Sequence, residues 1–314
     1  MTQTPTPTPT TGTTIQARAA LRERVITPAP KAHRARSAAV RFLLRAVLVA
    51  FACLFLYPFA WLIAASLKPR DEVFDNALIP HTLQPRNYTE VWAQLPLVSW
   101  IWHSVVIALL AAGLVAISSS LVAFGFAHFR FPGRNFLFGL VLATMMLPGA
   151  VTMVPQYLIW KYLGLLGTWV PLFGMNLFGS AFYIFLQRQF FLGLPKELFE
   201  AARLDGASYF DLFRRIAMPL SIPSLIIVFI FEFQASWNSL QSALIYLSAG
   251  SVDGFTVPLG ISYAMTTFSP TNGGHGDYQY VMVASLIVTL PMLLLFIYGQ
   301  RYFIEGVATQ GRKG

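Results

Sequence analysis

The residue types that support catalysis are few in this chain and are scattered along it. Its five histidines do not form the His-Glu-x-x-His pattern of zinc hydrolases, and its single cysteine, Cys53, lies in an apolar run. The sequence also contains no Gly-x-x-x-x-Gly-Lys-Ser/Thr motif, which forms the phosphate-binding loop of many nucleotide hydrolases. We therefore expect a non-catalytic protein that holds no metal or cofactor of its own.

Polar and turn-forming residues concentrate in one segment, residues 191–220. Pro195 suits the start of a helix. Gly206 permits a backbone turn that residues with a Cβ resist. Ser208 and Asp211 have the spacing of a capping box, which starts a second helix. The segment is therefore predicted to form a helix-turn-helix.

The two predicted helices of this segment carry different surfaces. Ala201 and Ala202 give the first helix a small face that admits close approach of another backbone. The second helix carries an apolar stripe at helical spacing, formed by Tyr209, Leu212, Phe213 and Ile216. Such a surface suits a groove in another protein. It equally suits the bilayer or the chain's own bundle, and the periodicity does not separate these alternatives.

A second polar group lies within an apolar stretch, residues 221–245. Glu232 is near the middle of this stretch, where a carboxylate is costly unless it is protonated, paired or in contact with water. If this stretch is one continuous helix, three further polar residues fall roughly on one face, and these are Gln234, Asn238 and Gln241. The aromatic residue Trp237 is adjacent to them. Amides can bind sugar hydroxyls and an indole can stack on a sugar ring, so this group is a candidate solute pathway. The same residue types also form hydrogen bonds between membrane helices.

The elements that position these residues are membrane spans. Of the 314 residues, 56% are hydrophobic and 11% are charged, and the mean hydropathy is +0.60. Soluble domains carry about 25% charged residues, so this composition excludes a soluble enzyme. Six apolar stretches are long enough to cross about 30 Å of hydrocarbon, and they cover residues 42–66, 101–127, 136–160, 169–190, 221–245 and 279–301. The expected fold is an all-α polytopic membrane protein with six transmembrane helices.

The distribution of basic residues orients the predicted spans. Most of the 22 Lys and Arg residues fall in the N-terminal segment, in loop 191–220 and in other connections on the same side of the membrane. Basic residues are retained on the cytoplasmic side, and an even number of spans then places both termini in the cytoplasm. Because this topology accounts for the net charge of +9, we expect no nucleic-acid partner.

These features divide the chain into four parts. Residues 1–41 are basic and rich in Thr and Pro, and are predicted to form a disordered cytoplasmic tail. Residues 42–100 contain the first span and an exterior loop. Residues 101–301 contain a core of five helices together with loop 191–220, and residues 302–314 form a cytoplasmic C-terminal tail.

The sequence of loop 191–220 resembles the EAA loop of permease subunits in bacterial ATP-binding-cassette importers. The resemblance rests on Glu200-Ala201-Ala202, on Asp205-Gly206-Ala207 and on the later Phe213. Other segments resemble the carbohydrate-uptake branch, specifically its maltose-system-type second permease, and these are Asn87-Tyr88-Thr89-Glu90-Val91, Trp237-Asn238 and Thr256-Val257-Pro258-Leu259-Gly260. The resemblance covers about residues 45–314.

This resemblance implies a subunit that forms half of a translocation pathway in the bacterial cytoplasmic membrane. The implied partners are the lipid bilayer, a second homologous permease, two ATPase subunits that bind ATP and Mg, and an extracytoplasmic solute-binding protein. The implied solute is a carbohydrate, either a mono- or oligosaccharide or a glycerol-phosphate-like compound. The implied ATPase-coupling residues are Glu200, Ala201, Ala202, Asp205, Gly206, Ala207 and Phe213.

Glu232 departs from this resemblance, because the family usually has an uncharged residue at that position. Together with His103 it leaves open a protein of another class, an ion-coupled secondary carrier that uses the intramembrane carboxylate. Such a carrier predicts internally repeated halves, and no such repeat is evident in the sequence. The expected solute-pathway residues are Glu232, Gln234, Trp237, Asn238 and Gln241.

Overall fold

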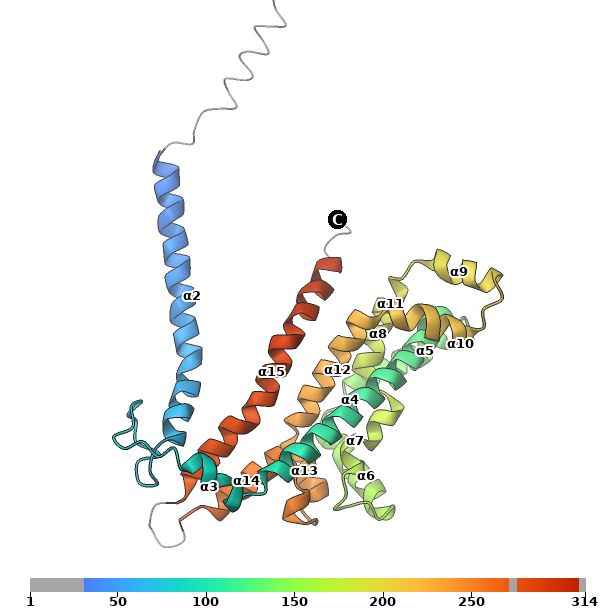
Figure 1. The fold of residues 1–314 in the computed structure, drawn as a ribbon. Helices are drawn as coiled ribbons and strands as arrows, with labels where there is room; N and C mark the ends of the chain where they lie inside the picture. The colour runs from blue at the N-terminus through green and yellow to red at the C-terminus, as the bar shows by residue number, and fades with distance from the viewer. Residues whose placement is uncertain (1–30, 271–275, 311–314) are drawn as a thin grey trace, which may run out of the picture. The chain divides into compact units, whose positions relative to one another are not determined.

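The computed structural model describes residues 31–270 and 276–310. All regular elements in this part of the chain are helical, which confirms the predicted all-α class. The chain divides into two units, residues 1–60 and 61–314, and each unit is described separately. Figure 1 shows the helices coloured along the chain.

The first unit contains most of helix α2 (Lys31–Ser66), which includes the span predicted at residues 42–66. The helix starts earlier than expected, because residues 31–41 are helical and were predicted to belong to a disordered tail. This stretch has no Gly or Pro and is rich in Ala and Arg, which favour helix. Residues 1–30 of the predicted tail lie outside the described part of the chain.

Four helices in the described residues are long and apolar enough to span a membrane, and the number reaches six if each of two bent helix pairs is one span. The four are Val40–Ser66, Leu97–His128, Val170–Leu192 and Tyr278–Gln300, and the bent pairs are Arg134–Met145 with Gly149–Tyr162 and Tyr209–Leu220 with Ile222–Trp237. These ranges overlap the six predicted stretches.

The second unit is organised around helix α4 (Leu97–His128). Helices α8 (Ala181–Leu192) and α12 (Ile222–Trp237) pack along it (Figure 1). The buried face of α4 is dominated by small side chains, among them Ala108, Ala111, Ala112, Ala116, Ser119, Ser120 and Ala123. Small residues allow membrane helices to approach closely, so α4 can occupy the centre of the bundle.

The stretch predicted as a single span at residues 136–160 consists of two helices. Helices α5 (Arg134–Met145) and α6 (Gly149–Tyr162) are bent by 97° relative to each other. Pro148 lies in the break, where it lacks a backbone N–H and disfavours helical backbone at the residue before it. The predicted span is therefore a bent pair of helices and not one straight helix.

The predicted span at residues 169–190 is also interrupted. Helix α7 (Val170–Phe173) and the 3-10 helix η1 (Gly174–Phe178) precede α8. Gly179 follows with a φ of 78°, and the N–H of the next residue donates to Ser119 Oγ at 3.1 Å. A hydroxyl on α4 thus satisfies backbone that a continuous helix would have paired internally.

The prediction of one helix over residues 221–245 was wrong as well. Helix α12 ends at Trp237, and a separate helix, α13 (Leu240–Leu247), begins after Ser239. Asn238 lies at the break and donates its side-chain amide to the Gln234 carbonyl at 2.8 Å. Asn side chains compete with helical backbone hydrogen bonds in this way, so α13 does not continue the faces of α12.

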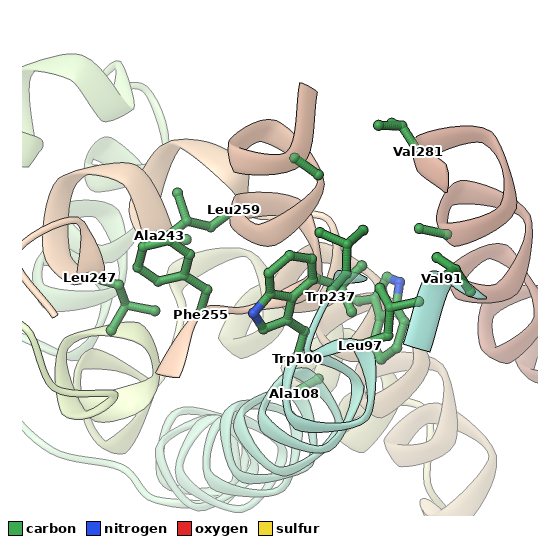
Figure 2. Packing of buried hydrophobic residues seen from close by; sticks show 14 of the residues in the cluster. Val91, Leu97, Trp100, Ala108, Trp237, Ala243, Leu247, Phe255, Leu259 and Val281 are labelled. Carbon is green, nitrogen blue, oxygen red and sulfur yellow. The ribbon is translucent and has the colours of Figure 1, made fainter. Parts of the chain in front are cut away.

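One end of the second unit contains three short helices, one long helix and a buried tryptophan. The elements are α3 (Asn87–Gln94), η3 (Val252–Gly254), α14 (Val257–Thr267) and α15 (Tyr278–Gln310). Trp100 of α4 is fully buried among their apolar residues and donates its indole N–H to the Val252 carbonyl at 2.8 Å (Figure 2). A Cβ on Gly260 would lie 2.3 Å from this ring, so glycine is required for α14 to pack so closely.

Between α8 and α12 the chain forms the loop predicted as a helix-turn-helix. Its elements are α9 (Lys196–Leu204), α10 (Tyr209–Asp211), the π-helical turn η2 (Leu212–Ala217) and α11 (Met218–Leu220). The helical stretch of residues 209–220 is bent by 77° from α12. The predicted helix-turn-helix is confirmed.

Candidate functional site

The turn of loop 191–220 depends on one glycine. Helix α9 follows Pro195, as predicted, and ends at Leu204. Gly206 then adopts a φ of 84°, in the left-handed region that residues with a Cβ rarely occupy. No neighbouring atom lies within 4 Å of the position that a Cβ would take. The requirement for glycine is therefore set by the backbone conformation and not by crowding.

The second helix of the loop begins with a complete capping box. Ser208 Oγ accepts a hydrogen bond from the Asp211 N–H at 3.1 Å, and the Asp211 carboxylate accepts one from the Ser208 N–H at 3.3 Å. Arg215 forms an ion pair with Asp211 at 3.3 Å. Hydrogen bonding from Ser208, assisted by the nearby arginines, holds the pKa of Asp211 below its usual range. The predicted capping box is confirmed.

One face of the loop is anchored in the bundle. A buried cluster joins Phe199, Leu212, Phe213 and Ala217 of the loop to Ala123, Phe124, Ile184 and Phe191 of α4 and α8. The rings of Phe213 and Phe124 have centroids 5.3 Å apart. The inner part of the apolar stripe therefore packs against the chain's own bundle. Phe213, with 8% of its surface exposed, anchors the loop to the bundle.

The opposite face of the loop is open. Glu200, Ala201, Asp205 and Gly206 are exposed, whereas Ala202 and Ala207 are half-buried against the cluster under the loop. Leu204 is 90% exposed and was not singled out from the sequence. The sequence did contain a signal for this exposure. Leu204 comes directly before Asp205-Gly206, and a leucine at the end of an amphipathic helix lies beyond the part of the helix that packs on the bundle.

The two helices of the loop are tied to each other and to α4 by aromatic contacts. The guanidinium of Arg203 lies 4.3 Å from the centroid of the Tyr209 ring. The Tyr209 ring in turn makes an edge contact with Phe129, with centroids 4.8 Å apart. The loop therefore has a defined shape in which the acidic and small residues of α9 face outward.

A polar cavity of about 240 Å³ lies between helices of the second unit. It is lined from α4, α6, η1, α12 and α13, and Glu232 is one of its lining residues. Asn176 donates its side-chain amide to Glu232 Oε1 at 2.5 Å and to the Ala111 carbonyl at 3.2 Å. The Tyr183 hydroxyl also hydrogen-bonds to Glu232. Among the described residues, the carboxylate is thus held by polar donors and not by a basic side chain.

The other residues of the predicted solute stripe do not share a face with Glu232. Gln234 and Asn238 are exposed, away from the cavity. Trp237 is buried in the apolar core beside Trp100 (Figure 2). Gln241 is on α13 and donates to Met153 Sδ at 3.4 Å. The stripe was predicted on one continuous helix, and the break at Asn238 separates its members.

The cavity instead uses residues that the sequence analysis missed. These are Ser236, Ser239 and Ser242 from the α12–α13 break, Asn176 from η1, and Ser104, Gln156, Tyr246 and Thr256 from surrounding elements. The three-residue spacing of the serines was a usable signal. Pro171, Gly174 and Gly179 are a sequence signal for the break that forms η1, but the contact of Asn176 with Glu232 is tertiary and had no such signal.

His103 does not join Glu232. It is absent from the residues that line the cavity, and its ring packs on Trp169 with centroids 4.3 Å apart. Among the described residues, His103 Nδ1 has no hydrogen-bond partner. The two residues that motivated the carrier alternative therefore do not line this cavity together.

Comparison with protein families gives a match over most of the second unit. Residues 117–308 match the family described as the binding-protein-dependent transport system inner membrane component. This range contains loop 191–220 and most of the residues that line the cavity.

Several curated proteins are similar over most of their length. The arabinooligosaccharides transport system permease protein AraQ of Halalkalibacterium halodurans is 33% identical over 263 residues, which is 82% of this chain and 91% of that protein. The lactose transport system permease protein LacG of Rhizobium radiobacter is 31% identical, over 83% of this chain and 92% of that protein. The maltose/maltodextrin transport system permease protein MalG of Salmonella typhimurium is 32% identical, over 70% of this chain and 73% of that protein.

A solved structure shares the fold. A chain from a bacterial ABC transporter involved in import of the acidic polysaccharide alginate superposes with a TM-score of 0.70. The alignment covers 85% of this chain and 98% of that chain, with 23% sequence identity. The two chains therefore share a fold.

Proposed function

Because the chain belongs to the family of binding-protein-dependent transport system inner membrane components, we propose that it forms half of the solute pathway in an ATP-driven carbohydrate importer. It is a permease subunit, and ATP hydrolysis is performed by a separate ATPase. The relatives named above transport arabinooligosaccharides, lactose and maltose or maltodextrin, and this chain spans most of each one. These names support a neutral sugar as the solute.

The proposed complex contains four further polypeptides, one of which is extracytoplasmic. Membership of the family implies an ATPase and a solute-binding protein as partners. We extend this to two ATPase subunits that bind ATP and Mg, a second homologous permease and an extracytoplasmic binding protein. The proposed topology places both termini in the cytoplasm of a bacterial cell, since the basic residues concentrate on that side.

The exposed face of loop 191–220 is the observation that supports this function best. Glu200, Ala201, Asp205 and Gly206 form an open surface of acidic and small side chains, while Phe199 and Phe213 anchor the same loop to the bundle. Acidic groups can pair with basic side chains or backbone donors of a partner, and alanines permit a close fit. We assign this surface, which we call the coupling face, to the ATPase.

The alternative of an ion-coupled carrier has no support from the family match. The two proposals differ in their energy source, so uptake by the purified complex in proteoliposomes separates them. The importer predicts sugar uptake that requires ATP on the side of the coupling face and persists when ionophores collapse the ion gradients. Uptake driven by an ion gradient in the absence of ATP would overturn the proposed function.

A further inference from the structure

The polar cavity is composed of hydroxyls, amides and one acid. Its polar lining comes from Glu232 of α12, from Asn176 of η1, and from Ser236, Ser239 and Ser242 at the α12–α13 break. Among the described residues that line it, none is Lys, Arg or His. An anionic group in this cavity would therefore meet a carboxyl side chain and no basic partner, which in a low-dielectric site is strongly unfavourable.

Thr256 lines the cavity and carries a buried hydroxyl. Its side chain is 6% exposed, and its Oγ1 has no hydrogen-bond partner among the described residues. It stands at the start of α14 but makes no capping hydrogen bond. A buried hydroxyl without a partner is costly and is usually satisfied by protein, water or ligand. Because Thr256 is one of the residues that line the cavity, a solute bound there could supply the partner.

The size of the cavity limits what can enter. Its volume of about 240 Å³ is smaller than the roughly 300–1,000 Å³ of typical small-molecule pockets. A single sugar ring or a few waters suit this volume better than an oligosaccharide chain. The mixed lining of hydroxyl, amide and carboxyl groups can both donate to and accept from sugar hydroxyls.

We propose that this cavity is a subsite for one uncharged, hydroxyl-bearing ring of the solute, and that Glu232 excludes solutes carrying phosphate or carboxylate there. The inference rests on the proposed function and narrows it, because it removes the glycerol-phosphate-like solutes that the sequence resemblance allowed. Asn176 and Tyr183 position the carboxyl group, and Thr256 donates to or accepts from the bound ring.

The first test is transport by the complete complex in proteoliposomes. The probes are maltose and lactose as neutral sugars and alginate oligosaccharide as an acidic one. Thr256→Val keeps the shape of the side chain and removes the hydroxyl, so it should raise the KM for the transported neutral sugar roughly 2- to 10-fold. The matched control is Thr266→Val, because Thr266 is exposed on the same helix and does not line the cavity. An unchanged KM for Thr256→Val would overturn the assignment of the hydroxyl.

The second test measures charge selectivity inside the cavity without relying on transport. Cys53 is the single native cysteine, so Cys53→Ala provides a background for Ser239→Cys within the cavity and Ser248→Cys on the exposed end of α13. Reaction rates with cationic and anionic methanethiosulfonates are compared as a ratio. The ratio of the cationic to the anionic reaction rate should be several-fold higher at position 239 than at position 248, and it should fall with Glu232→Gln. Both reactions at position 239 should also slow when the transported neutral sugar is present.

The outcomes separate this inference from the function on which it rests. Absence of ATP-dependent uptake of every sugar tested would overturn the proposed function and the inference with it. Normal ATP-dependent uptake together with no sugar protection at position 239 would overturn the inference alone and leave the cavity as water-filled or occupied by the partner permease. Preferred uptake of alginate oligosaccharide by the wild-type complex would also contradict it.

Discussion

The ring of Phe199 in helix α9 lies 4.3 Å, centroid to centroid, from the imidazole of His128 in the last turn of helix α4. His128 also stacks on Phe124 at 4.4 Å, one turn earlier on α4. The coupling face is thus connected through two rings to the helix at the centre of the bundle. Closely packed side chains transmit displacement to their neighbours. A movement of α9 must therefore shift this end of α4 or break the contact.

Shortening Phe199 should uncouple the loop from the bundle. Phe199→Ala removes a ring that is only 7% exposed, and such changes cost roughly 3–5 kcal/mol in well-packed cores. We expect sugar-stimulated ATP hydrolysis by the complex to fall at least about tenfold while the chain still inserts into the membrane. Phe136→Ala is the control, since Phe136 is 75% exposed outside the loop. Equal hydrolysis by both variants would show that the Phe199 contact carries no coupling.

The turn at Gly206 should not accept a β-branched residue. At a φ of 84° a residue with a Cβ costs roughly 1–2 kcal/mol or more, so Gly206→Val should distort the coupling face. We expect loss of ATPase co-purification and of uptake, with membrane insertion unchanged. Gly133→Val imposes the same strain at a φ of 79° in the α4–α5 connection, also without neighbours within 4 Å. If both variants lose the ATPase equally, the effect is general and not specific to this loop.

Charge reversal on the coupling face should weaken docking. Glu200→Lys places a cation where we propose that the ATPase offers basic side chains or backbone donors. ATPase association measured by co-purification should fall, and more so at low ionic strength, where repulsion is less screened. The same change at Glu197, exposed in the first turn of α9, is the matched control and should retain association. Retained association for Glu200→Lys would remove Glu200 from the interface.

Packing at Trp100 should make Gly260 indispensable for stability. A Cβ at this position would lie 2.3 Å from the indole ring, and overpacking of this kind costs typically 1–3 kcal/mol. Gly260→Ala should therefore lower the thermal unfolding temperature of the detergent-solubilised protein. Gly113→Ala in α4 is the control, because no neighbouring side chain lies within 4 Å of its added Cβ. An unchanged unfolding temperature for Gly260→Ala would contradict the close packing of α14.

The sequence was sufficient for features that depend on local chemistry. The turn at Gly206 and the capping box of Ser208 and Asp211 follow from backbone preferences within a few residues, and both are present. The positions of the apolar stretches were also predictable, because their length is set by the bilayer. The breaks at Pro148 and Asn238 were not anticipated, since hydropathy does not distinguish a bent span from a straight one.

The solute pathway was harder to predict than the loop for a physical reason. The cavity depends on Asn176 in η1 reaching Glu232 on α12, and these residues come together only because the fourth span is broken. Similarly, the periodicity that places Phe213 on an apolar stripe identifies an apolar face without showing what covers it. Its burial against Phe124 is a tertiary contact that no local pattern contains.

The central claim, that the coupling face docks on an ATPase, is tested most directly by cross-linking from Leu204. Leu204 is 90% exposed beside Asp205-Gly206, and Leu204→Cys in the Cys53→Ala background places one reactive thiol on this face. A short photoactivatable thiol reagent should join position 204 to the ATPase subunit in the assembled complex, and should not do so from Leu83→Cys, an exposed position between α2 and α3. Absence of an ATPase adduct at position 204 in an active complex would contradict the account.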